Sequence, residues 1–556
     1  MALTFRLPAR PRAHASPRTM PRKTARWRMV GLALLCWPAL MPVHAQTQAP
    51  ANALALPALG DTASLELSPM AERRLGDRIM RSIRRDPDVV DDPLVLQYIN
   101  QVWFALLTSA RQHGEIGPEL DASHAWEPFL VRDRSVNAFA LPGGYIGVHF
   151  GLLAMTTTPD ELASVLAHEM SHVTQRHIAR MIGQQSRQSW VSLASMVLGI
   201  LAASRNPAAA QAMIYGGQAV AIQGQLNFSR DMEREADRVG YSLLGDAGFE
   251  PSGMALMFEH LQQASRLNDD GSFPYLRTHP LTSERIGEAR ARLGPMGWAN
   301  AARAGHTDSA RWAQHMLMAA RSKVLMDARS VSLQNLLNPE VKRDTPALQA
   351  VAAYYTAGVA LQRSGDAKRA ITALNQARVA AKFLPDSQVP TVDRVLVLAL
   401  TESLLTAHQP IEAVTMLSKV VSDKQSSLPG DDRPELLLSA QVAMTLPDGP
   451  AQASAMADTT SRLQTHVSTK PHDAAAWSAL AELWRRQDQT LRAVRAEAEA
   501  TAALGDLPGA IDRIQGAQKR FRQPDAADVI ELSVMDARLK TWQRQQREDM
   551  RDEGGG

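Results

Sequence analysis

The sequence HEMSH at residues 168–172 places two histidines four positions apart, with a glutamate directly after the first. Residues four apart on a helix share one face, so His168 and His172 can bind the same metal ion. Glu169 is turned by about 100° from His168 around the helix axis. It can therefore take a proton from water beside the metal without becoming a ligand. The pattern predicts a hydrolytic Zn²⁺ site; the alternative is two histidines that merely share a helix face.

A helix is expected around this motif, from Pro159 to about Met181. Thr158 can cap its first turn, proline suits the first helical position, and Glu161 completes a capping box. Upstream, the pattern of apolar residues predicts helices over 71–83 and 93–107 and an extended segment over 126–140. The turn Leu141-Pro142-Gly143-Gly144 then leads into a second strand at 145–150, and these strands are the one clear sheet signal.

A catalytic zinc ion uses three protein ligands, so the two histidines need a third. The metzincin spacing requires glycine at 175 and histidine at 178, where this chain has Gln175 and Ile178. His177 is expected to face away from the metal, because it follows His168 by nine positions on one continuous helix.

A better third ligand lies 61 residues beyond His172, in the run 229–237. Glu233 and Asp237 are four apart and share a helix face, so Glu233 can bind the metal while Asp237 holds a ligand histidine from behind. Glu235 is expected to point elsewhere. Taken alone, this run also reads as an ordinary charged helix.

HExxH followed by Ser-Arg-x-x-Glu-x-x-Ala-Asp at 229–237 resembles the gluzincin family of CAAX prenyl proteases and heat-shock proteases. In that family the glutamate of Glu-x-x-x-Asp is the third zinc ligand, which implies Glu233 here and one Zn²⁺ per chain. More specifically, the chain resembles the periplasmic members that assist the assembly of outer-membrane β-barrel proteins. Further matching segments are Gly76, Asp92-Pro93, Tyr98-Ile99-Asn100, NAFALPGG at 137–144, and Thr278-His279-Pro280 with Arg285.

The resemblance gives two of these segments a role. An extended edge formed by Asn137, Ala138, Phe139 and Ala140 would pair with a substrate backbone; the alternative is an internal strand. His279 would fill the fourth zinc position and keep the enzyme latent; the alternative is a loop histidine beside a rigid proline. The implied substrates are unfolded or stalled outer-membrane proteins, with the β-barrel assembly machinery as a partner of the C-terminal repeats.

The C-terminal third predicts helical repeats. Gly365-Asp366 and Gly505-Asp506 begin segments of identical internal spacing and lie 140 residues apart, which is four periods of 35. That is close to the tetratricopeptide period of about 34 residues, in which small residues such as Gly358 and Ala370 let two helices approach. The alternative is an alanine-rich helical bundle.

The predicted fold class is therefore mainly α: a gluzincin metalloprotease domain with a small β-sheet, followed by an α-solenoid of tetratricopeptide-like hairpins. A chain of 556 residues exceeds what one core normally serves. The expected parts are a signal peptide (1–45), a linker (46–66), the protease domain (67–315), the repeat domain (316–537) and a polar tail (538–556) that should fray.

Residues 1–45 predict export to the periplasm, since they combine eight basic residues, a short apolar run at 29–40 and a cleavage-like Val43-His44-Ala45. Without them the chain has 52 basic and 57 acidic residues, so we expect no nucleic-acid partner. The only cysteine, Cys36, lies within this signal, which leaves no disulfide and no thiol nucleophile in the mature chain.

The apolar stretches 190–203 and 208–222 are each shorter than the ~20 residues that span a bilayer. We expect them to be buried helices, or else a surface over 190–222 that makes peripheral contact with a membrane or touches a client protein. Two other functions remain open from the sequence. One is a chaperone or scaffold that acts through the repeats with latent proteolysis, and the other is a membrane-embedded protease that uses 190–222 as a hairpin.

Overall fold

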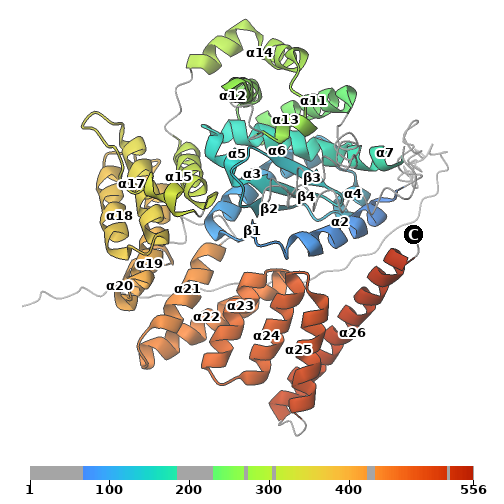
Figure 1. Cartoon of the computed structure of the whole chain (residues 1–556), viewed down its shortest axis with the longest axis vertical. Coiled ribbons are helices and arrows are strands. Elements are labelled where there is room, and N and C mark those ends of the chain that lie inside the picture. The colour runs from blue at the N-terminus through green and yellow to red at the C-terminus, as the bar shows by residue number, and fades with distance from the viewer. Residues whose placement is uncertain are drawn as a thin grey trace, which may run out of the picture. The chain divides into compact units, whose positions relative to one another are not determined.

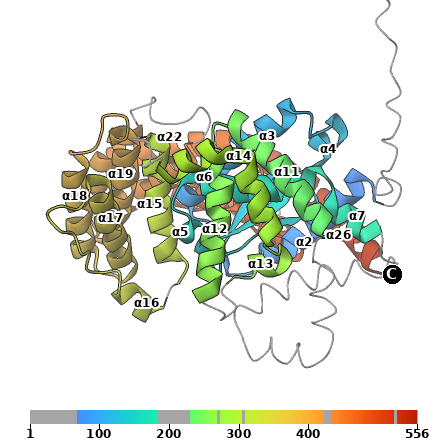
Figure 2. The same cartoon turned by 90° about the horizontal axis from the view of Figure 1, so that it is seen from above.

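The computed structural model describes residues 67–183, 229–267, 273–303, 309–327, 329–421, 432–521 and 526–554. This part of the chain is mostly helical and contains one four-stranded sheet (Figures 1 and 2). None of its helices combines the length and the apolar composition that crossing a membrane requires. The predicted signal peptide, the linker and the apolar segment 190–222 lie outside the described residues.

The first half contains the sheet and the helices around it. Its elements are α2 (Pro69–Ile83), β1 (Val89–Val90), α3 (Pro93–Gln112), α4 (Pro118–Ser123), β2 (Glu127–Val131), β3 (Ala138–Leu141), β4 (Tyr145–His149), α5 (Phe150–Met155), α6 (Pro159–Thr174), α7 (His177–Gly183), α11 (Arg230–Asp246), α12 (Ser252–Leu267), α13 (Tyr275–Thr278) and α14 (Ser283–Arg303).

The second half is helical throughout its described residues. Its elements are α15 (Ala310–Leu325), α16 (Ser330–Gln334), α17 (Ala347–Arg363), α18 (Ala367–Ala381), α19 (Val389–Thr406), α20 (Pro410–Val421), α21 (Arg433–Thr445), α22 (Pro450–Thr469), α23 (Ala474–Arg486), α24 (Thr490–Ala503), α25 (Leu507–Arg520) and α26 (Ala526–Gly554).

The strands lie in the order β1-β2-β4-β3, so β3 forms one edge of the sheet. β2 and β4 are parallel, and β3 is antiparallel to β4. Because side chains alternate along a strand, Ile146 and Val148 of β4 join the core formed with α3 and α6. Tyr145 packs on the other face with Phe129 and α2. The two expected strand regions are therefore present, and the structure adds the two-residue strand β1.

The expected single helix over 159–181 is two helices, so this prediction was wrong at its C-terminal end. α6 ends at Thr174, Arg176 adopts a left-handed φ of 53°, and α7 begins at His177. The guanidinium of Arg176 donates to the backbone carbonyl of Leu67 and so helps to hold the chain at this break. The break turns α7 away from the axis of α6, and the expected position of His177 no longer holds.

The beginning of α6 agrees better with the sequence. Thr158 caps the helix, since its hydroxyl accepts a hydrogen bond from the backbone N–H of Glu161 at 3.2 Å. The Glu161 carboxylate, however, accepts from the N–H of Thr157 at 2.7 Å rather than from that of the cap residue. The capping box is thus displaced by one residue. Two backbone N–H groups at the start of the helix, those of Thr157 and Glu161, still have side-chain acceptors.

The two segments with matching spacing have the same local structure. Gly365 and Gly505 have φ of 84° and 85°, and the following aspartates cap α18 and α25. Gly358 allows α17 and α18 to approach closely, because a Cβ at this position would lie 2.6 Å from Cγ of Leu374. Figure 1 shows α23, α24 and α25 side by side, as expected for stacked hairpins. Assignment to the tetratricopeptide class stays a prediction.

The predicted boundary after residue 315 falls inside α15. His315 of this helix lies 2.8 Å from the Tyr98 hydroxyl of α3, measured from its Nδ1 atom. Val351 of α17 belongs to the same hydrophobic core as Leu317 of α15 and Ile99 of α3. α15 therefore packs against both parts, and the two predicted domains share a core here.

The predicted polar tail, residues 538–556, is helical in its described part. These residues continue α26 to Gly554. Leu539 and Trp542 are buried three positions apart on one face of the helix. Asp549 accepts a hydrogen bond from Arg81 of α2 at 2.6 Å. Because the segment is polar overall, its composition did not reveal these few contacts.

Candidate metal centre

The site is built where α6 and α11 touch. Gly240 of α11 makes this contact possible, because a Cβ there would lie 3.1 Å from the backbone of Ala167 and His168. α11 begins at a cap formed by Ser229, whose hydroxyl accepts from the N–H of Met232 at 3.2 Å. The close approach brings the acidic residues in the first turns of α11 beside the histidines of α6.

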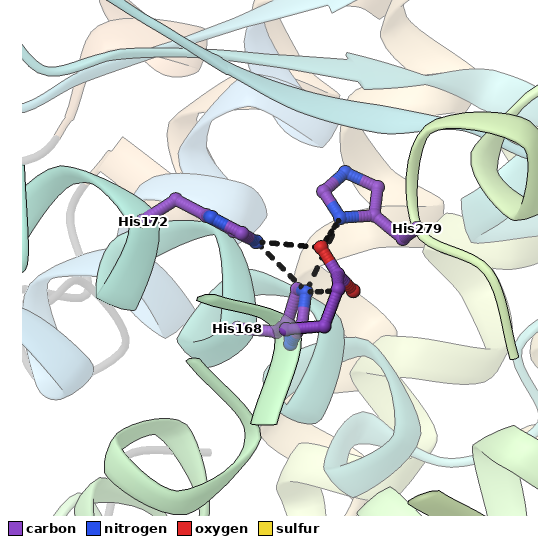
Figure 3. A group of neighbouring side chains, drawn as sticks. His168, His172 and His279 are labelled. Atoms are coloured by element: carbon purple, nitrogen blue, oxygen red, sulfur yellow. Dashed lines mark hydrogen bonds and ion pairs between the residues drawn. The ribbon is translucent and has the colours of Figure 1, made fainter. Parts of the chain in front are cut away.

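Among the described residues, one buried group has the donor atoms and spacing to hold a metal ion: His168, His172, Glu233 and His279, with one ligand atom from each within 4.8 Å of the others. Figure 3 shows the three imidazoles converging on a common centre. The Nε2 atom of His168 lies 3.0 Å from Nε2 of His172 and 3.3 Å from Nδ1 of His279. Oε1 of Glu233 lies 3.0 Å from Nδ1 of His279 and 3.5 Å from Nε2 of His172.

These spacings fit a tetrahedral ion. Zinc–nitrogen bonds of roughly 2.0–2.1 Å at tetrahedral angles separate neighbouring ligand atoms by about 3.3 Å. Imidazole nitrogen and carboxylate oxygen are also the donors that zinc takes in hydrolytic sites. None of the four side chains is more than 2% exposed, so the ligands are held in a site from which bulk water is excluded.

His168 is held from behind by a buried ion pair. Its Nδ1 atom lies 2.9 Å from Oδ1 of Asp237. Arg285 donates two hydrogen bonds to the same carboxylate, at 2.6 and 2.8 Å. Its third nitrogen lies 2.8 Å from Glu233 and donates to the carbonyl of Pro280 at 2.9 Å. One arginine thereby links the support of His168, the carboxylate of Glu233 and the loop that carries His279.

Glu169 faces the edge of the sheet. Its Oε2 atom accepts a hydrogen bond from the backbone N–H of Ala140 at 3.1 Å. Oε1 is buried, accepts no hydrogen bond and lies 3.5 Å from Nε2 of His279. Glu169 is thus beside the cluster of donor atoms without being part of it, as the helical spacing predicted.

Residues 138–140 of the predicted strand 137–140 belong to β3, which is an edge strand of the sheet within the described residues. The alternative, an internal strand, does not agree with this strand order. The carbonyl of Asn137 accepts from the N–H of His149 at 3.1 Å. In an antiparallel pair with this register, the backbone groups of Ala138 and Ala140 point outward. The side chain of Phe139 lies on the face of the sheet that packs against α2, where it contacts Phe129 edge-on.

Comparison with known proteins agrees with this geometry. Residues 113–293, which include all four members of the cluster, match the model of Peptidase family M48. The chain contains an M48 peptidase domain. The predicted resemblance to a metallopeptidase family is therefore confirmed.

Relatives of this M48 domain carry names of two kinds. The beta-barrel assembly-enhancing protease of Escherichia coli K12 is 34% identical over 241 residues, which are 43% of this chain and 47% of that protein. Its namesake in Yersinia pestis is 35% identical over 263 residues, 47% of this chain and 52% of that protein. The mitochondrial metalloendopeptidase OMA1 of Arabidopsis thaliana is 35% identical over 161 residues, 29% of this chain and 30% of that protein. The chain thus spans about half the length of the two bacterial relatives.

The charges in the M48 site suit a cation. Burial would raise the pKa of Glu233, but the three histidines around it lower this pKa far more, so the carboxylate stays ionised. Burial lowers the pKa of His172 well below its usual value, so its imidazole is neutral, which is the form that binds metals. Burial opposes a charge on His168, yet Asp237 and Glu233 outweigh it and raise its pKa to about 9.

His177 lies outside the cluster, so the expectation that it is not a ligand agrees with the structure, but the single helix on which that expectation rested is broken. Its Nδ1 atom lies 2.9 Å from Nδ1 of His172, on the side of that ring that faces away from the cluster. Glu235, which was expected to point elsewhere, lies 3.0 Å from the other nitrogen of His177. The signal that could have revealed both is the helix break at Arg176, and neither glycine nor proline marks it in the sequence.

Proposed function

We propose that the protein is an exported, zinc-dependent endopeptidase that acts in the periplasm on unfolded or stalled outer-membrane β-barrel proteins. The observation that carries this proposal is the convergence of His168, His172 and Glu233 beside Glu169 in an M48 domain. Bound zinc would supply Lewis acidity, which makes water nucleophilic at neutral pH and polarises the peptide carbonyl.

The residues of the chain divide the work. His168, His172 and Glu233 would hold the ion, and Asp237 would keep the ring of His168 in the correct orientation. Glu169 would accept the proton of the attacking water and pass it to the departing amine. Its burial supports this role, because burial raises the pKa of Glu169 against the opposing effects of His279 and His168 and so makes it a stronger base.

The edge of β3 would bind the substrate backbone. An extended peptide beside β3 would add a strand to the sheet through main-chain hydrogen bonds to Ala138 and to the carbonyl of Ala140, with little dependence on side chains. The contact between Ala140 and Glu169 supports this placement, since a peptide on this edge lies next to the proposed base. Binding of this kind suits a protease for unfolded clients.

His279 would act as a fourth ligand in a latent state of the enzyme. Its ring stacks on Tyr275 with ring centres 4.7 Å apart, and its backbone N–H donates to the Tyr275 carbonyl at 2.8 Å. With its Nδ1 atom 3.0 Å from Glu233, it occupies the side of the cluster nearest Glu169. Withdrawal of this loop would then open the position that the attacking water needs.

The client class rests on the names of the bacterial relatives, which connect homologous domains with β-barrel assembly. If the helical second half is the predicted repeat domain, its stacked hairpins would offer a concave surface for clients or for the assembly machinery. Zinc is the proposed ion because its usual donors match the cluster.

Replacement of Glu169 by glutamine tests the proposal. We expect the variant to bind zinc like the wild type but to cleave an unfolded outer-membrane protein at least ~100-fold more slowly, because general-base catalysis is lost. Glu119→Gln, a change of the same kind at an exposed position, should keep full activity. Equal cleavage by the Glu169 variant and the wild type would refute the assignment, and full function of this variant in cells would favour the scaffold alternative.

A further inference from the structure

His172 is the start of a chain of polar contacts that leads out of the M48 site to the surface. Its Nδ1 atom lies 2.9 Å from Nδ1 of His177. The Nε2 atom of His177 lies 3.0 Å from Oε2 of Glu235, which also accepts a hydrogen bond from Arg180 at 2.9 Å. His177 is fully buried, whereas the side chains of Glu235 and Arg180 are 28% and 39% exposed.

The positions of the protons in this chain follow from the contacts. A neutral imidazole has one nitrogen that donates and one that accepts. If Nε2 of His172 carries the lone pair that faces the cluster, its proton is on Nδ1 and is donated to Nδ1 of His177. The proton of His177 is then on Nε2 and is donated to the carboxylate of Glu235. All three contacts are satisfied by this one arrangement.

The reverse arrangement would place a proton on Nε2 of His172. That nitrogen lies 3.0 Å from Nε2 of His168, on the side of the ring where the ligand atoms converge. A proton there would block the lone pair that a metal ion needs. The acidic end of the chain at Glu235 therefore favours the arrangement that leaves His172 ready to bind.

We propose that His177 and Glu235 are positioning residues that hold His172 in the metal-binding tautomer and orientation. This inference rests on the proposed metal site. It gives His172 the same kind of support that Asp237 and Arg285 give His168: a hydrogen-bond acceptor behind the ring, backed by an arginine.

The helix α11 supplies acidic side chains to the cluster and to both of its supporting contacts. α11 supplies Glu233 to the cluster, Asp237 to the back of His168 and Glu235 to the back of His177. The three acidic residues fall on alternate positions over five residues, which turns the first and last toward α6 and the middle one toward α7. The break between α6 and α7 is what brings His177 within reach of both partners.

The test is the zinc affinity of the full chain, measured by competition with a chromophoric chelator. His177→Ala removes the acceptor behind His172, and we expect affinity to fall about 10–100-fold, as is usual for the loss of such a partner. His177→Asn keeps an acceptor oxygen close to the position of Nδ1 and should recover most of the affinity. Glu235→Gln, at a partly exposed position, should give a smaller loss than His177→Ala.

The matched control is His315→Ala, which also removes a buried imidazole with two hydrogen-bond partners but lies outside the cluster. It should lower thermal stability and leave the zinc affinity of the folded protein unchanged. In the zinc-loaded wild type with ¹⁵N-labelled histidine, two-bond ¹H–¹⁵N spectra should show His172 protonated at Nδ1.

The possible outcomes separate the two proposals. Wild type that binds no zinc would overturn the proposed metal site itself. Wild type that binds zinc while His177→Ala binds it equally well would overturn only the positioning role. An asparagine variant as weak as the alanine variant would do the same, because the loss would then come from packing rather than from the hydrogen bond to His172.

Discussion

Two buried histidines of this protein have opposite pKa shifts, because their rings contact different groups. His168 is surrounded by carboxylates and has a pKa raised to about 9, although its burial acts against the charge. His315 is equally buried but lies between the Tyr98 hydroxyl and the Thr156 carbonyl, at 2.8 and 3.0 Å. Burial lowers its pKa to about 4 against the smaller effects of Thr156 and Glu161. The carboxylates around His168 attract positive charge, as a metal site requires, whereas the surroundings of His315 suit a neutral ring.

The neutral core histidine predicts a pH dependence of stability. With a pKa of about 4 in the folded protein and ~6.5 in the unfolded chain, His315 leaves stability intact above pH 6.5. Below this pH the unfolded chain binds the proton first, so stability falls as the pH approaches 4, by up to about 3 kcal/mol. His315→Gln should lose correspondingly less over this window, measured by denaturant unfolding at a series of pH values. Parallel losses in both proteins would contradict the assignment.

At the scale of elements, the close contact of α6 with α11 is what assembles the site. Gly240→Ala would place a methyl group 3.1 Å from the backbone of Ala167 and His168. We expect a loss of about 1–3 kcal/mol of stability from this overpacking, together with weaker zinc binding because Glu233 is displaced.

Gly245 offers a matched control on the same helix, since a Cβ there would meet nothing within 4 Å. Gly245→Ala should be neutral or stabilise by up to about 1 kcal/mol through helix propensity. Chemical denaturation and chelator competition on both variants decide the matter. Two alanine variants with equal stability and zinc affinity would show that the helix contact does not control the site.

The elements show which kinds of local signal can be read from sequence. The start of α6 was predictable, because Thr158 and Pro159 are strong local signals, and so was the strand β4 after the Gly143-Gly144 turn. The end of α6 was not, because Arg176, which has a left-handed φ at the break, is held by a contact with Leu67, more than 100 residues away. β1 has only two residues, too few to give a sequence pattern, and it is defined only by its pairing with β2.

At the scale of the whole molecule, the predicted limits of the parts differ from the limits of the helices that the structure has. The matched family model covers 113–293, within the predicted protease domain. α15 crosses the predicted boundary because its buried face contacts helices on both sides in sequence. The polar tail joins α26 because Leu539 and Trp542 find partners there. Such limits depend on packing between distant segments, which composition does not reveal.

More of the candidate metal ligands than of the residues around them could be predicted from the sequence. Glu233 and His279 lie 61 and 107 residues beyond His172, so only the resemblance to a known family could connect them. The structure brings both to the histidines of α6. The motifs quoted above specify neither His177 nor Glu235, and the contact between these two residues depends on the helix break.

The proposed zinc site can be tested by a crystal structure of the full chain loaded with zinc, with an anomalous difference map at the zinc absorption edge. We expect one strong peak per chain, within about 2.3 Å of Nε2 of His168, Nε2 of His172 and a carboxylate oxygen of Glu233. Glu169 should remain outside this distance. A map with no peak among these residues, or a peak bound by Glu169 in place of Glu233, would rule out the proposed ligand set.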